Sequence, residues 1–91
     1  MTISFNGAWV RVGSVSCLVV SVRPRIFEDA YECDLVRLAL ELRFRVPIVV
    51  MTQDDGATPK FRGRPGLVAA LRRVGVTALP WRRIHPGEHA P

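Results

Sequence analysis

The sequence VSCLVVSV, residues 15–22, begins with alternating polar and apolar residues and then becomes almost continuously apolar. A strand with one solvated face keeps the alternation, whereas a strand that is buried on both faces loses it. We therefore expect residues 15–22 to form a central strand. Helices must then cover the sheet, which indicates an α/β fold.

Two turn signals lie on the N-terminal side of this strand. Asn6-Gly7 has the composition of a type I′ hairpin turn, and Gly13-Ser14 that of a type II′ turn. Residues 8–12 alternate between the two turns. The sequence thus predicts an N-terminal antiparallel hairpin or meander that leads into residues 15–22.

A helix is predicted over residues 29–44, after a break at Arg23-Pro24-Arg25. Asp29 and Glu32 have the spacing of a capping box, and Pro47 stops the helix soon after its last turn. Apolar residues at helical spacing form a stripe that three further side chains widen. The stripe is Tyr31, Leu35, Leu38 and Leu42, and the side chains that widen it are Val36, Leu40 and Phe44.

The second half of the chain continues the alternation of strands and helices. Residues 47–52 are an apolar strand, and a helix begins at Pro65 and ends near Gly75. Residues 78–84 resemble an edge strand, because Pro80 cannot donate a hydrogen bond within a sheet. The predicted fold class is α/β, a small mixed sheet in the order β-β-β-α-β-α-β, in which an antiparallel meander precedes a parallel βαβαβ unit.

The composition is that of one globular domain. The chain has 91 residues, of which 48% are hydrophobic and 23% are charged, and this excludes a disordered protein. Residues 1–84 are predicted to form a single α/β domain and residues 85–91 a frayed tail. Cys17 and Cys33 lack metal-type spacing, so we expect buried, reduced thiols. With no signal peptide and no long apolar run, the expected location is cytoplasmic, away from membranes.

Positive charge is concentrated in the second half of the chain. Residues 1–55 carry six arginines and seven carboxylates, whereas residues 56–91 carry seven basic side chains and only Glu88. Such asymmetry favours an anionic partner, although it is also compatible with a solvated basic surface. The long connection at residues 53–66 follows the carboxyl end of a strand, where open α/β sheets bind ligands. The predicted anion-binding residues are Lys60, Arg62, Arg64, Arg82 and Arg83.

Other chemistry-bearing residues give weaker patterns. Asp54 and Asp55 could hold a metal or act as acid and base, but Asp-Asp-Gly is also a common turn composition. His85 and His89 are four residues apart, yet Pro86 and Gly87 argue against a helix that could use this spacing for a metal. No Ser-His-Asp or Cys-His arrangement can be assembled. We therefore predict no metal, no cofactor and no catalytic residues.

The leading functional hypothesis is a small, non-enzymatic binding or regulatory module. It would act through self-association or contact with another protein, and it would carry a basic anion-binding side. A homodimer is expected because the apolar face of helix 29–44 is too wide for one contact. Two alternatives stay open: nucleic-acid binding through the basic side, and a phosphate-ligand or metal-assisted enzyme that uses Asp54 and Asp55.

Overall fold

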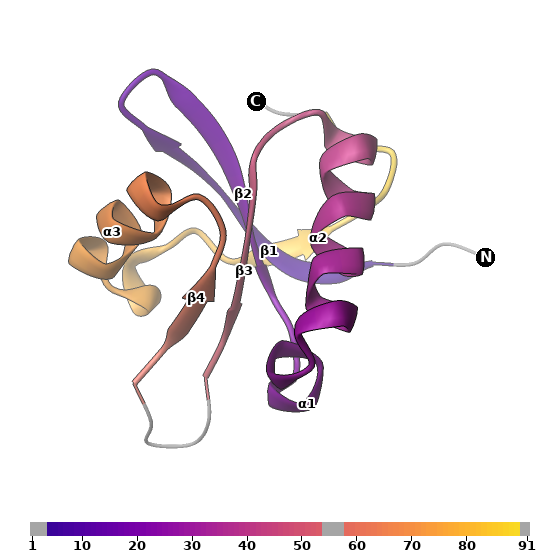
Figure 1. Ribbon diagram of the computed structural model, residues 1–91. Coiled ribbons are helices and arrows are strands. Elements are labelled where there is room, and N and C mark those ends of the chain that lie inside the picture. Colours follow the sequence, from indigo (N-terminus) through magenta and orange to yellow (C-terminus); the bar gives the residue numbers. More distant parts are fainter. Residues whose placement is uncertain (1–3, 54–57, 90–91) are drawn as a thin grey trace.

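A five-stranded mixed sheet forms the centre of the molecule (Figure 1). The computed structural model describes residues 4–53 and 58–89. Helices on both faces of the sheet make a three-layer domain, and the predicted α/β class with a mixed sheet is confirmed. The strands, in the spatial order β4-β3-β2-β1-β5, are β1 (Phe5–Val12), β2 (Val15–Ser21), β3 (Ile48–Thr52), β4 (Lys60–Arg62) and β5 (Arg82–Ile84). The helices are α1 (Pro24–Glu28) and α2 (Ala30–Phe44) on one face, and α3 (Pro65–Val74) on the other.

β3 and the later part of β2 are buried on both faces, and for β2 this confirms the prediction made from its loss of alternation. Cys17 and Val19 point to the cluster under α3, whereas Leu18 and Val20 point to the cluster under α1 and α2. The two strands pair in parallel. Each cluster is thus closed by helices that the chain supplies on that side of the sheet.

The predicted N-terminal meander is wrong at its first turn. β1 runs through Asn6-Gly7 without a break, and Gly7 pairs with Val20 on one side and Arg82 on the other. A Cβ atom at Gly7 would lie 2.8 Å from the Ile84 side chain. The glycine therefore marks a close approach between neighbouring strands rather than a turn. The turn at Gly13-Ser14 is confirmed, and Gly13 has the positive φ of 61° that this turn requires.

The predicted parallel βαβαβ unit is also wrong in its second half. Among the described strands only β2 and β3 pair in parallel, because β5 joins the far edge of the sheet and pairs antiparallel with β1. The connection at residues 53–66 contains β4, which pairs antiparallel with β3 and was not predicted. α3 then carries the chain from one edge of the sheet to the other. Three residues flanked by glycine and proline carry too short a pattern to predict a strand.

Local signals explain where the helices begin and end. Asp29 caps α2, since its side chain accepts a hydrogen bond of 3.1 Å from the backbone N–H of Glu32. Arg45 ends α2 in a left-handed conformation, and its N–H donates to the carbonyl of Glu41 at 2.8 Å. α1 was not predicted, although Pro24 at its first turn is a favourable start.

The C-terminal strand is shorter than predicted. Residues 78–84 divide into the end of a 3-10 helix, η1 (Val76–Ala78), a linking segment and β5, so Pro80 lies outside the sheet. β5 is an edge strand, as expected. Residues 85–89, for which a frayed tail is expected, form a turn in which the N–H of His85 donates to the Glu88 carboxylate at 2.7 Å.

Candidate functional site

The predicted anion-binding residues divide between the two edges of the sheet. Lys60 and Arg62 belong to β4 at one edge, and Arg82 and Arg83 belong to β5 at the other. Four strand spacings separate the two edges, a distance of about 19 Å. Arg64 precedes α3 at its N-cap position and makes no side-chain cap. The structure therefore does not bring the five cations together into one basic patch.

Arg62 turns toward the layer of α1 and α2. Its guanidinium carbon lies 4.8 Å from the centroid of the Phe27 ring, a cation–π contact. Arg62 also lies near Cys33, where its charge partly offsets the effect of burial, which raises the pKa of that thiol. Arg62 is thus engaged in packing along the β4 edge.

At the other edge, Arg82 and Arg83 have different neighbours. Arg82 forms an ion pair with Glu88. The hydrogen bond from Arg82 and a second one from the N–H of His85 hold the pKa of Glu88 below its usual value. Arg83 donates to the side-chain oxygen of Asn6 at 3.4 Å. Within the described residues Arg83 has no carboxylate partner, so it is the uncompensated cation of this edge.

A cavity of about 440 Å³ lies beside Arg83, at the carboxyl ends of the parallel strands β2 and β3. We call it the strand-end cavity. Its polar lining comes from Asn6, Ser21, Gln53, Arg82 and Arg83. Open α/β sheets commonly bind ligands at this end of their strands. Arg82 and Arg83 were predicted from the sequence as anion-binding residues. Asn6 and Ser21 were not predicted as part of the same site, because their position beside Arg83 depends on the pairing of distant strands.

The apolar part of the strand-end cavity is made by Val22, Met51, Val76 and Trp81. Trp81 packs against the cluster under α3, and its indole N–H donates to the carbonyl of Val76 at 2.7 Å. The N–H of Val22 donates to Met51 at 2.9 Å, and the Thr52 hydroxyl donates to the carbonyl of Val22 at 2.9 Å. Both the indole wall and the strand ends are therefore fixed by hydrogen bonds.

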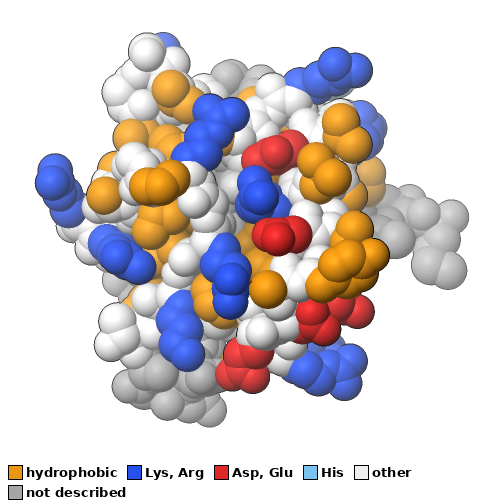
Figure 2. All heavy atoms as spheres, viewed as in Figure 1, with side chains coloured by type: hydrophobic (Ala, Val, Ile, Leu, Met, Phe, Trp, Pro, Cys, Tyr) orange, Lys and Arg blue, Asp and Glu red, His pale blue; other side chains and the backbone are white. Residues whose placement is uncertain are grey.

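A second unusual surface lies on the outer side of α2. Figure 2 shows hydrophobic side chains gathered over this helix, at the right of the view. The exposed fractions are 74% for Tyr31, 49% for Leu35, 53% for Leu38 and 69% for Leu42. These four residues are the predicted stripe, and we call them the outer stripe. The expectation that part of the apolar face of this helix stays uncovered is confirmed.

α2 has two apolar sides. One packs against the sheet, and the outer stripe on the other side faces away from it. Cys33, Leu40 and Phe44 point to the cluster against the sheet. They lie two residues after members of the outer stripe, and two residues turn a helix by about 200°, to its opposite side. A helix that is apolar on two opposite sides is normally covered on both.

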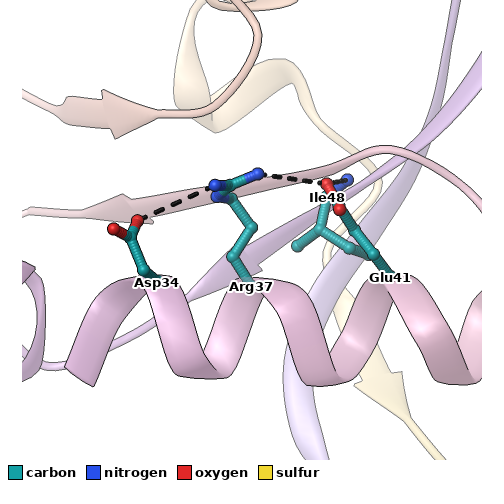
Figure 3. A network of polar contacts seen from close by, with 4 residues as sticks. All are labelled: Asp34, Arg37, Glu41 and Ile48. Carbon is teal, nitrogen blue, oxygen red and sulfur yellow. Dashed lines mark hydrogen bonds and ion pairs between the residues drawn. The ribbon is translucent and has the colours of Figure 1, made fainter. Parts of the chain in front are cut away.

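A polar network holds α2 in this orientation (Figure 3). Arg37 lies between Asp34 and Glu41 along the helix, at 3.8 Å and 3.3 Å from their carboxylate oxygens. Glu41 also accepts a hydrogen bond of 3.5 Å from the N–H of Ile48, the first residue of β3. The network links the side of α2 to the sheet and limits rotation of the helix about its axis.

The remaining candidates form no metal-ligand cluster in the part of the chain that the structure describes. Asp54 and Asp55 lie outside the described residues. Among residues 4–53 and 58–89, no three His, Cys, Asp or Glu side chains group as metal ligands would, and no helix is long and apolar enough to cross a membrane. Cys17 and Cys33 are buried as predicted, on opposite faces of the sheet, and burial raises the pKa of the Cys17 thiol.

Comparisons with known proteins give no family: the chain matches no protein-family model, no curated protein and no solved structure. Two surfaces of the molecule have features of binding sites. They are the outer stripe on α2 and the strand-end cavity at the carboxyl ends of β2 and β3.

Proposed function

We propose that this protein is a non-enzymatic binding module that self-associates through the outer stripe of α2. The observation that carries the proposal is the exposure of one tyrosine and three leucines in a row on one helix. Single exposed apolar residues are ordinary, but a contiguous exposed patch is typical of an interaction surface. Tyrosine is also enriched where proteins meet.

The spacing within the outer stripe suits a partner helix. Tyr31, Leu35, Leu38 and Leu42 follow one another at intervals of four, three and four residues. This is the spacing of the seam along which two helices of a coiled coil pack. Ala39 lies beside the seam and is small enough to allow close approach.

The charges along α2 favour a second copy of the chain as the occupant. Glu28, Asp29 and Glu32 are exposed near the start of the helix, whereas Arg43 and Arg45 are exposed at its end. When two copies pack antiparallel about a two-fold axis, the acidic end of each helix meets the basic end of the other. The helix dipoles are then also antiparallel. Leu35 and Leu38 lie nearest the axis.

The size of the outer stripe limits the expected affinity of self-association. α2 has 15 residues and is therefore about 22 Å long. A contact of this length between two helices buries less than the roughly 800 Å² per partner of a standard interface. We therefore expect a monomer–dimer equilibrium in the micromolar range rather than a permanent dimer.

Sedimentation velocity and light scattering of the full chain, from low micromolar to near-millimolar concentration, test the proposal. We expect the mean mass to rise from monomer to dimer, and Leu38→Glu to stay monomeric because two buried carboxylates would face each other at the axis. Val74→Glu is the matched control. Val74 has almost the same exposed fraction, 52% against 53% for Leu38, but it belongs to α3.

The charge arrangement is tested separately. Arg43→Glu should weaken the dimer, and the double variant Glu32→Arg with Arg43→Glu should restore it, since the two ends exchange their signs. A wild-type chain that is monomeric at every concentration would overturn self-association. Equal loss of the dimer in Leu38→Glu and Val74→Glu would show that the interface lies elsewhere.

A further inference from the structure

We infer that the strand-end cavity binds a small organic anion that carries one carboxylate or phosphate group beside a flat apolar body. The site is separate from the outer stripe, because the two surfaces share no residue and the cavity lies at the carboxyl ends of β2 and β3. Its volume of about 440 Å³ falls within the range of small-molecule sites.

A row of polar side chains crosses the sheet at this cavity. Arg83 pairs with Asn6 in β5 and β1, and the β1–β2 register, continued by one residue, places Ser21 next to Asn6. Ser21 in turn pairs with Met51. By strand alternation these side chains point to the face of Ala8, Val19 and α3.

The row offers several hydrogen-bond donors in the lining of one cavity. The Arg83 guanidinium has five N–H groups, and its only hydrogen bond within the described residues is the long one to Asn6. With its oxygen accepting from Arg83, the Asn6 side chain keeps its NH₂ group as a second donor at the cavity lining. The Ser21 hydroxyl and the Gln53 amide also line the cavity. A fork of guanidinium donors beside neutral donors fits a carboxylate or a phosphate.

The charge at the cavity favours an anion of low charge. Arg82 is compensated by Glu88, whereas Arg83 has no carboxylate partner in the described part of the chain. Among the described residues, the lining of the cavity therefore carries about one net positive charge. One anionic group neutralises this charge, whereas a polyphosphate chain would have no further unpaired cations to bind among the described lining residues.

The apolar side of the cavity favours a ligand whose uncharged part is flat and apolar. Val22, Met51, Val76 and the half-buried Trp81 offer an apolar wall that includes an indole. An aromatic or similarly flat group fits against such a wall and gains from burial and stacking. Since Trp81 is held by its bond to Val76, this wall exists before the ligand arrives.

NMR titration of the full chain with phenyl phosphate and with benzoate tests the inference. We expect shifts at the indole N–H of Trp81 and at the side-chain amides of Asn6 and Gln53, and Arg83→Gln should weaken binding by roughly tenfold or more, the value of a charge-assisted hydrogen bond. Arg73→Gln is the matched control, because Arg73 is an exposed arginine of α3 outside the cavity lining. The tighter of the two probes identifies the anionic group.

Neutral phenol tests the apolar wall alone, and inorganic phosphate tests the anion-binding donors alone. Both should bind more weakly than phenyl phosphate. Equal losses in Arg83→Gln and Arg73→Gln would show binding by general surface charge and would overturn the inference. So would shifts that avoid Trp81, Asn6 and Gln53, or no shifts up to millimolar probe. Repeating the titration in Leu38→Glu keeps the outcome separate from that of self-association.

Discussion

Gly7 lies where β1, β2 and β5 crowd together inside the sheet. A Cβ atom at this position would be 2.8 Å from Cγ1 of Ile84, 3.1 Å from the carbonyl oxygen of Val19 and 3.3 Å from Cδ1 of Leu18. Ile84 and Leu18 are both buried, so neither can move freely. The absence of a side chain at this residue therefore allows the sheet to close against β5.

Gly7→Ala should lower the free energy of unfolding by about 1–3 kcal/mol, because overpacking forces buried neighbours to shift. Urea denaturation followed by circular dichroism measures the change. Gly66→Ala is the control: no atom lies within 4 Å of a Cβ built there, and the residue is in α3. This change should be neutral or stabilise by up to about 1 kcal/mol. Equal stability of the two variants would contradict the role given to Gly7.

Asn6-Gly7 shows why turn chemistry alone could mislead. The same dipeptide suits a tight turn and a strand that another strand approaches closely, and the choice depends on Ile84, 77 residues away from Gly7. Gly13-Ser14 had no such competitor, and its turn was predicted correctly. A local signal was reliable where only local contacts decide the outcome.

The start of α2 depends on one side chain. Asp29 accepts the N–H of Glu32, and an N-cap of this kind contributes about 1 kcal/mol. Asp29→Ala should lower the free energy of unfolding by about this amount, whereas Asp29→Asn should lower it less, because asparagine also caps well. Thermal and urea unfolding monitored at 222 nm compare the two. An alanine variant as stable as the asparagine variant would exclude a capping contribution.

At the level of the elements, the sequence predicted those with long patterns. The strands at 15–22 and 47–52 and the two longer helices are present, because their apolar residues repeat over several turns or strand positions. β4 and α1, with three and five residues, were too short for any pattern. For α2 the sequence predicted an apolar face wider than one contact can cover. Which side of the helix packs against the sheet could not be predicted, because it depends on the sheet.

The sheet order decides how charge is distributed over the whole molecule. β4 and β5 carry most of the predicted anion-binding residues and lie at opposite edges. Their separation of about 19 Å exceeds the Debye length of about 8 Å at physiological ionic strength. The two groups of cations therefore act separately. No sequence pattern could supply this result, since strand order depends on where α3 delivers the chain.

For this reason we expect only weak binding to nucleic acid. Fluorescence anisotropy with labelled duplex and single-stranded DNA and RNA should give no measurable affinity at physiological salt, and a shallow salt dependence below it. Lys60→Gln and Arg83→Gln, one at each edge, should have small and independent effects. Tight binding whose affinity falls steeply with added salt would show instead that the cations act on one bound strand.

The pairing of Phe5 with Ile84 has a consequence for synthesis on the ribosome. β1 and β2 can form a hairpin early in translation. The other edge of β1 can pair with β5 only after residue 84 has left the exit tunnel. Until then the nascent chain exposes an unprotected strand edge, the usual route to aggregation. A helper protein that shields this edge during translation, or slower growth at lower temperature, should raise the yield of native protein.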